Sequence, residues 1–161
     1  WLLDPVAPHG LRAEFLGALL TRLYPEQPLP ADLAAVTVKC EVHRRFNHLD
    51  QGTRADVVVW GSDRCFSLVI EVKVGAGEQS AQCDRLYKEF VAATPDTRFV
   101  FLTPSGKSPE TATGLAKETF QILSFTTVRE ILASLLEDRD EITPGLNTAR
   151  SYLNTLCKEF S

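Results

Sequence analysis

Three ionisable residues, Asp56, Glu71 and Lys73, stand inside two apolar runs near the middle of the chain. If these runs are buried, the charges need partners, because burying an unpaired charge is strongly unfavourable. Two carboxylates and an ammonium can satisfy one another as a salt bridge. They can also form a divalent metal site, in which carboxylate oxygens are hard ligands and the lysine stands beside a metal-bound water. The pattern Asp…Glu-x-Lys is short and recurs by chance, so spacing alone leaves both interpretations open.

The elements that must position these residues are predicted to be the two strands of a β-hairpin within residues 54–74. Both runs are rich in Val and flank a polar turn that starts at Gly61, which is typical of such a hairpin. Glu71 and Lys73 are two positions apart, so both point to the same face of a strand. The opposite face carries an apolar stripe of Leu68, Ile70, Val72 and Val74.

The remaining apolar periodicities predict four helices and three further strands. The helices are predicted over residues 9–24, 78–93, 126–136 and 144–160, and the strands over 36–46, 98–103 and 120–125. Thr127 and Glu130 have the spacing of a capping box. Residues 104–114 are predicted as a loop because they are rich in Pro, Ser, Thr and Gly. The order α-β-β-β-α-β-β-α-α implies an α/β fold with a mixed sheet flanked by helices.

The length and composition are those of one globular domain. The chain has 161 residues, of which 44% are hydrophobic and 24% charged, so we expect a single domain over residues 1–161. No apolar run approaches the roughly 20 residues that span a bilayer, which predicts no membrane association. The cysteines include no Cys-x-x-Cys pair, which argues against a zinc knuckle and favours a reducing, cytoplasmic setting. The chain lacks Met and starts at Trp1, so we expect that the native N-terminus is missing, and the chain is interpreted either as a domain of a longer protein with additional domains or as a processed chain.

Positive charge is concentrated just before the central hairpin, although the chain carries a net charge of −4. An acidic chain does not by itself indicate a nucleic-acid-binding protein. Five basic residues nevertheless fall within one short stretch: Lys39, His43, Arg44, Arg45 and Arg54. This stretch is interpreted either as a solvated strand edge, where basic residues oppose aggregation, or as a track for phosphates.

These residues and this order of elements resemble the PD-(D/E)XK nuclease superfamily, whose restriction-endonuclease-like core is α-β-β-β-α-β. Its motif acid lies on the second strand, where this chain has Asp56, and its (D/E)-x-K lies on the third, where this chain has Glu71-Val72-Lys73. The proline usual before the motif acid is Ala55 here. Two stretches are similar to a bacterial, defence-associated branch: Trp1-Leu-Leu-Asp-Pro with His9-Gly10 and Phe15-Leu16, and Glu78-Gln79 with Gln82-Cys-Asp-Arg85-Leu-Tyr87.

The resemblance covers roughly residues 1–125 and implies Mg²⁺-dependent hydrolysis of phosphodiester bonds in DNA, with Mn²⁺ as a substitute. It assigns Asp56, Glu71 and the backbone carbonyl of Val72 to one or two metal ions. A fourth acidic group is expected from the first strand or the first helix, which makes Glu41 and Glu14 the candidates.

The same resemblance gives roles to residues around the metal. Lys73 would orient the attacking water and stabilise charge on the phosphate. Gln82, on the helix after the hairpin, would stand at the edge of the catalytic site. Arg54, Arg85 and Arg45 would contact the phosphate backbone. The residues alone also allow an exposed polar helix face for Gln82 and Arg85, and a salt bridge at the rim for Arg54.

DNA is therefore the expected partner, and a homodimer is allowed because double-strand cutters of this kind often pair two sites. Two alternatives stay open. The net negative charge and the lack of a recognisable base-reading element favour a catalytically inactive module of the same fold, used for binding or assembly. The same catalytic residues would also serve a nuclease that acts on RNA or on single strands.

Overall fold

The two apolar runs at the centre of the chain form the predicted antiparallel hairpin. They are β2 (Thr53–Trp60) and β3 (Phe66–Val72), which pair from Trp60↔Ser67 to Val57↔Ile70. The computed structural model describes residues 1–44, 52–75, 77–137 and 139–160. Period-two alternation thus predicted the element that carries the ionisable residues.

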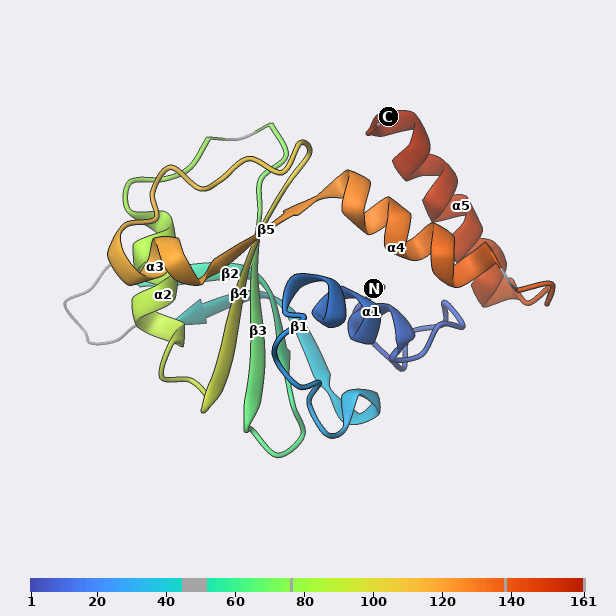
Figure 1. Cartoon of the computed structure of the whole chain (residues 1–161), viewed down its shortest axis with the longest axis horizontal. Coiled ribbons are helices and arrows are strands. Elements are labelled where there is room, and N and C mark those ends of the chain that lie inside the picture. The colour runs from blue at the N-terminus through green and yellow to red at the C-terminus, as the bar shows by residue number, and fades with distance from the viewer. Residues whose placement is uncertain (45–51, 76, 138, 161) are drawn as a thin grey trace.

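The hairpin lies in the middle of a mixed five-stranded sheet with the order β1-β2-β3-β4-β5. β1 pairs antiparallel with β2, whereas β4 and β5 run parallel to β3. The sheet therefore changes from antiparallel to parallel at β3, and Figure 1 shows helices on both of its faces. The additional strands are β1 (Thr37–Arg44), β4 (Asp96–Thr103) and β5 (Phe120–Ser124).

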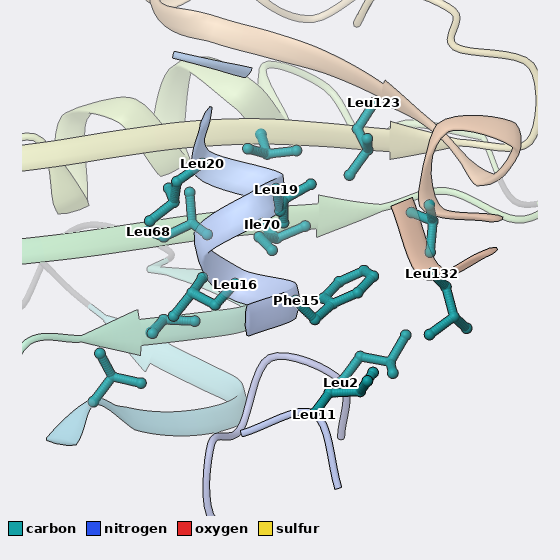
Figure 2. Close-up of a cluster of buried hydrophobic side chains, with 14 of the residues drawn as sticks. Leu2, Leu11, Phe15, Leu16, Leu19, Leu20, Leu68, Ile70, Leu123 and Leu132 are labelled. Atoms are coloured by element: carbon teal, nitrogen blue, oxygen red, sulfur yellow. The ribbon is translucent and has the colours of Figure 1, made fainter. Parts of the chain in front are cut away.

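One face of the sheet is covered by α1 (Glu14–Leu23) and α4 (Phe125–Glu137), and α5 (Pro144–Glu159) packs on α4. Figure 2 shows leucines of α1 meeting Leu68 and Ile70 of β3. The predicted apolar stripe of β3 is confirmed up to Val72, but Val74 is 54% exposed. This core holds the hairpin from one side.

The other face is covered by α2 (Gln82–Phe90) and the short α3 (Gly114–Thr119). Leu86 and Phe90 of α2 pack against Phe99 and Phe101 of β4 in a second core. Glu71 faces α2 from β3, since its side chain is hydrogen-bonded to Gln82. The charged position of β3, Glu71, is therefore on the α2 side of the sheet.

The predicted order α-β-β-β-α-β of the core is confirmed, with corrections at helix ends. α1 begins at Glu14 and not at residue 9, because Gly10 and Arg12 have φ angles of +76° and +49°. α2 begins at Gln82 and not at residue 78, because Ala81 has a φ of +49°. Such angles cannot continue a right-handed helix.

One local prediction was wrong, and two short elements were not predicted. The start of α4 is capped by Ser124, whose Oγ accepts from the backbone N–H of Thr127 at 3.0 Å. Thr127 and Glu130 are therefore not its capping box. α3 was not predicted, and neither was the single turn η1 (Leu33–Ala35). No helix within the described ranges has the length and apolar character needed to cross a bilayer.

β1 is an exposed edge strand with an irregular centre. Glu41 has a φ of +54°, in the left-handed region that a residue other than glycine rarely adopts. The pairing with β2 is recorded up to Cys40↔Val57 and resumes at Val42↔Ala55. Glu41 therefore interrupts the ladder directly opposite Asp56.

Candidate active site

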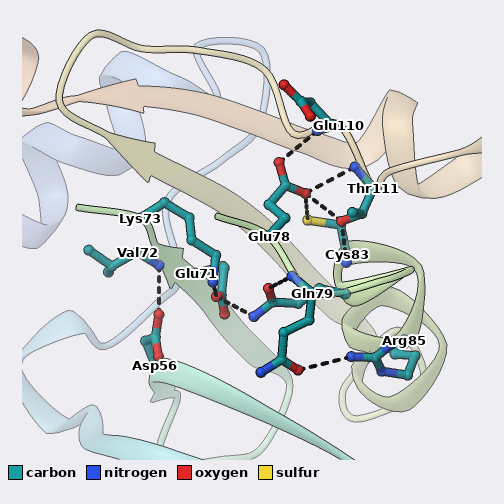
Figure 3. Close-up of polar contacts among 11 residues, drawn as sticks. Asp56, Glu71, Val72, Lys73, Glu78, Gln79, Cys83, Arg85, Glu110 and Thr111 are labelled. Carbon is teal, nitrogen blue, oxygen red and sulfur yellow. Dashed lines mark hydrogen bonds and ion pairs between the residues drawn. The ribbon is translucent and has the colours of Figure 1, made fainter. Parts of the chain in front are cut away.

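The site begins where the pairing of β2 and β3 stops. Within the described strands, the last pair is Val57↔Ile70, and the next positions along each strand are Asp56 and Glu71. The half-buried carboxylate of Asp56 accepts a hydrogen bond from the backbone N–H of Val72 at 2.8 Å (Figure 3). A side-chain oxygen thus replaces a backbone acceptor, and this contact fixes Asp56 against the end of β3.

Glu71 is almost fully buried, with 1% of its surface exposed. Its Oε1 lies 2.9 Å from Nζ of Lys73 and also accepts a hydrogen bond from Nε2 of Gln82. Its Oε2 is buried and has no hydrogen-bond partner among the described residues. Buried polar atoms are rarely left unpaired, because the loss of their hydration is not compensated. This oxygen therefore points to a missing ligand.

Gln82 holds Glu71 from the first turn of α2. While its Nε2 donates to Glu71, its Oε1 accepts from the backbone N–H of Gln79 at 3.1 Å. Because both ends of the amide are engaged, the hydrogen-bond network sets its orientation. The predicted proximity of Gln82 to the acidic residues is present in the structure.

Burial raises the pKa of the Glu71 carboxyl above its ordinary value. The hydrogen bond from Lys73 opposes this increase, and the negative charge of Asp56 adds to it. A divalent cation beside Oε2 would favour the ionised form by direct attraction. A cation at this position would therefore both contact the unpaired oxygen and favour the ionised form of Glu71.

The donor set fits Mg²⁺. In the described part of the chain, no three His, Cys, Asp or Glu side chains come together as a metal-binding group. The site therefore offers two carboxylates, with Val72 beside them. Mg²⁺ commonly takes one or two carboxylates, keeps several waters and binds substrate phosphates. Asp56 and Glu71 suit that mode of binding.

The acidic residues lie in a cleft of about 540 Å³ whose lining is rich in cations. Four Lys or Arg side chains line it against two carboxylates, so the cleft is locally positive although the chain is acidic. The guanidinium of Arg44 lies over the ring of Phe90, 5.0 Å from its centre. The other cations are Arg54, Lys73 and Arg85.

The structure brings most of the predicted site residues together at this cleft. Asp56, Glu71, Val72, Lys73, Gln82, Arg54 and Arg85 all line it. The rim salt bridge considered for Arg54 is also present, since its guanidinium lies 3.4 Å from the carboxylate of Glu41. Arg85 donates to the side chain of Gln79 at 3.4 Å.

Neither candidate for the fourth acidic group lines the cleft. Glu14 forms an ion pair with Arg139, in a part of the molecule where α1 meets α4. Glu41 is exposed and paired with Arg54, because the left-handed backbone at this position takes it out of the regular strand geometry. The predicted phosphate contact of Arg45 lies outside the described residues.

Two acidic residues near α2 have roles that the sequence did not indicate. Glu78 accepts from the backbone N–H groups of Glu110 at 2.7 Å and Thr111 at 3.0 Å, and from the Thr111 hydroxyl. Asp84 accepts from the backbone and hydroxyl of Thr113, each at 2.7 Å. Together they fasten residues 110–113 to α2. The partners are 29 to 33 positions apart, so no local pattern reveals them.

Burial alone would raise the pKa of Glu78, but the hydrogen bonds from Thr111 and Glu110 and the positive charge of Lys73 act in the opposite direction. Their combined effect lowers the pKa of Glu78 below its ordinary value. The carboxylate that fastens the loop is therefore held in its ionised form, and it lies within the field of Lys73.

The fold and the site define a restriction-endonuclease-like protein, with an acid on the second strand and Glu-x-Lys on the third. The family model of the PD-(D/E)XK nuclease superfamily matches residues 1–155, so the chain belongs to this superfamily. The match corrects the extent expected from the sequence, since it includes α4 and most of α5. Comparison with curated proteins finds no match, and comparison with solved structures finds none either.

Proposed function

We propose that this chain is a divalent-metal-dependent endonuclease that hydrolyses phosphodiester bonds in DNA. Membership of the superfamily supports nuclease activity. The observation that carries the proposal is the buried, unpaired Oε2 of Glu71 in the same cleft as Asp56. A salt bridge that satisfied every charged atom would leave no such oxygen.

In this proposal, bound Mg²⁺ supplies the Lewis acid that polarises the phosphate and lowers the pKa of a water molecule. Asp56 and Glu71 hold the ion, and Gln82 positions Glu71 through its hydrogen bond. The side chain of Lys73 is 15% exposed at the cleft, where its ammonium stabilises negative charge that develops on the phosphate. Lys73 is thus a catalytic residue, and Gln82 a positioning residue.

The cations of the cleft are proposed to bind the phosphates on either side of the reacting one. Arg54 and Arg85 are the predicted contacts, and Arg44 joins them because it lines the same cleft. A role in defence against foreign DNA, in the cytoplasm, is supported by the resemblance of the opening stretch. Phage challenge of bacteria that express wild type or Lys73→Ala would test this role, which requires that only the wild type protects.

Plasmid cleavage tests the proposed chemistry. We expect cleavage by the wild type with Mg²⁺ or Mn²⁺ and none with EDTA. Lys73→Ala should cut at least about 100-fold more slowly, since groups that stabilise transition-state charge contribute this much. Lys117→Ala changes an exposed lysine of α3 and should cut at the wild-type rate. Equal rates for Lys73→Ala and the wild type would disprove the assignment.

The ion pair between Lys73 and Glu71 favours a second candidate, a module of this fold that binds or assembles without cleaving. Calorimetry with Mg²⁺ separates the two. A nuclease should bind Mg²⁺ in the wild type and in Asp140→Ala, an exposed control, but not in Asp56→Ala. A non-catalytic module should show no Mg²⁺ binding that depends on Asp56. The homodimer stays a prediction, which sedimentation with and without DNA would measure.

A further inference from the structure

A second cleft, of about 500 Å³, opens beside Lys73. Among the described residues, Lys73 alone lines both this cleft and the one that contains Asp56 and Glu71. The two clefts are therefore neighbours that share the lysine proposed to contact the reacting phosphate. A polynucleotide with that phosphate at Lys73 would have the second cleft within reach of an adjoining nucleotide.

The chemistry of the second cleft differs from that of the first. Its two lysines, Lys73 and Lys107, are balanced by Glu78 and Glu110, so the lining carries no excess positive charge. The half-buried ring of Pro104 gives it apolar surface, Phe101 lies beneath it with only 2% of its surface exposed, and hydroxyl groups supply hydrogen-bonding partners. A neutral, partly apolar and partly hydroxylic lining suits a base and its sugar better than a run of phosphates.

The wall of this cleft is formed before any ligand binds. The backbone N–H of Lys107 donates to Oγ1 of Thr103 at 2.8 Å, which closes the turn that follows β4. Further along, Glu78 holds the backbone of Glu110 and Thr111. A site with its wall already in place loses little free energy to ordering when a ligand binds.

We propose that the second cleft binds one unpaired nucleotide next to the phosphate that is cut. This inference rests on the proposed nuclease function and names its substrate class. The cleft volume is within the range of small-ligand sites, which accommodates one nucleotide but not a base pair in its duplex. A base that enters the cleft must have left its complementary strand. The preferred substrate is therefore single-stranded, or locally unpaired, at this position.

Binding of a fluorescent single-stranded nonamer in EDTA tests the inference without relying on cleavage. Ser105→Trp and Ser108→Trp place a bulky ring at two exposed positions of the cleft wall. Ser151→Trp makes the same change at an exposed position of α5 and is the matched control. Thermal unfolding of all three variants verifies the fold.

The nonamer is then replaced by oligonucleotides with one abasic position each. For the wild type and Ser151→Trp, we expect one position at which loss of the base weakens binding about tenfold, as for a stacked base. Ser105→Trp and Ser108→Trp should bind the intact nonamer about tenfold more weakly. Their affinity should not fall further when the base at that position is missing. The Trp substitution and the loss of the base remove the same contact, so their effects do not add.

The inference is overturned if no abasic position matters to the wild type, or if both cleft variants bind like Ser151→Trp. Failure of the nuclease proposal gives a different result. Lys73→Ala and the wild type would then show equal cleavage with Mg²⁺, whatever the abasic pattern in EDTA. In a parallel assay with Mg²⁺, the wild type should cut an oligonucleotide unpaired at the responsive position faster than its full duplex, and equal rates would contradict the inference.

Discussion

At the scale of single residues, the two oxygens of Glu71 have opposite environments. One is engaged by Lys73 and Gln82, and the other has no partner among the described residues. The first interaction fixes the carboxylate, and the second oxygen is the one proposed to meet a cation. Gln82 is the neutral donor of the pair, so it orients Glu71 without adding a second positive charge to that of Lys73.

Gln82→Leu should therefore weaken Mg²⁺ binding and cleavage by about 10–100-fold, the effect typical of a group that orients a metal ligand. Gln82→Glu, which has the same shape but lacks the amide donor, should do the same. Gln27→Leu replaces an exposed glutamine and should have no effect. Mg²⁺ titration by calorimetry is the measurement, and an unchanged dissociation constant in Gln82→Leu would show that Glu71 is held without it.

How far such residues can be found from sequence depends on whether they interrupt a local pattern. Asp56, Glu71 and Lys73 interrupt apolar runs, so their position in one cleft was predictable, whereas the residues alone left a salt bridge and a metal site as alternatives. The hydrogen bond of Gln82 to Glu71 joins different elements, and only the family resemblance indicated it. Glu78 interrupts no pattern, and its partner Thr111 is 33 positions away.

A buried cation far from the site makes a separate prediction about stability. Arg98 is 3% exposed and donates to Asp96 through Nε and Nη2, at 3.0 and 2.7 Å. It also donates to the carbonyl of Pro28 and lies over the ring of Tyr24. Removing the carboxylate leaves this charge buried without its counter-ion.

Asp96→Ala should lower the free energy of unfolding by about 2 kcal/mol. Breaking a fully buried ion pair costs roughly 3–5 kcal/mol. The expected loss is smaller here because the Asp96 side chain is 41% exposed. Glu14→Ala removes a comparable pair in which Arg139 is 24% exposed and should cost about 1 kcal/mol or less. Urea denaturation measures both, and the reverse ranking would contradict the argument.

At the scale of elements, α2 serves both clefts. Its first turn carries Gln82, which holds Glu71, and the segment just before it carries Glu78, which holds the loop after β4. Because the Glu78 pKa is lower in the folded state than in the unfolded chain, its stabilising effect is complete above the unfolded pKa. The effect is lost as pH falls through the folded value.

Glu78→Gln should consequently reduce the free energy of unfolding at pH 7 by about 1 kcal/mol, the scale of one net hydrogen bond. The difference between this variant and the wild type should shrink as the pH falls below the ordinary glutamate pKa of about 4.3. Urea denaturation at pH 7 and at acidic pH gives both values. Glu118→Gln, on the exposed side of α3, is the control. A difference that stays constant with pH would exclude this role of the Glu78 charge.

The elements differ in how well the sequence predicted them. The hairpin and β4 have strong β-branched or aromatic runs, so their existence was evident. α3 has six residues and buries only Ala116, which leaves no apolar stripe to detect. α1 and α2 begin later than predicted because Arg12 and Ala81 have left-handed backbones. Arg and Ala are common in right-handed helices, so the sequence does not indicate this conformation.

At the scale of the whole molecule, the charge of the cleft has the opposite sign to the net charge of the chain. The chain has a net charge of −4, yet the cleft collects an excess of cations. Composition alone does not indicate nucleic-acid binding, because it does not reveal that the fold gathers these cations at one cleft. Basic residues from β1, β2 and α2 meet only once the sheet and helix are assembled.

DNA binding should accordingly weaken with added salt. If Arg44, Arg54 and Arg85 each contact a phosphate, the slope of log K against log salt should be about −2 to −3. Arg54→Ala should reduce its magnitude by about 1, whereas Arg22→Ala, at an exposed position of α1, should leave it unchanged. Fluorescence anisotropy over a salt series measures the slope, and equal slopes for the two variants would remove Arg54 from the contact set.

The attachment of residues 110–113 by two carboxylates of the α2 region has a consequence for how this protein can change over evolutionary time. The stretch between Thr103 and Glu110 is fixed at both ends, while Asp56 and Glu71, the two carboxylates proposed to bind the metal, lie on β2 and β3. On the two proposals above, mutations, insertions or a randomised library confined to residues 104–109 should change substrate preference while leaving Asp56, Glu71 and Lys73 in place. Recognition and catalysis would then be traits on which selection acts separately.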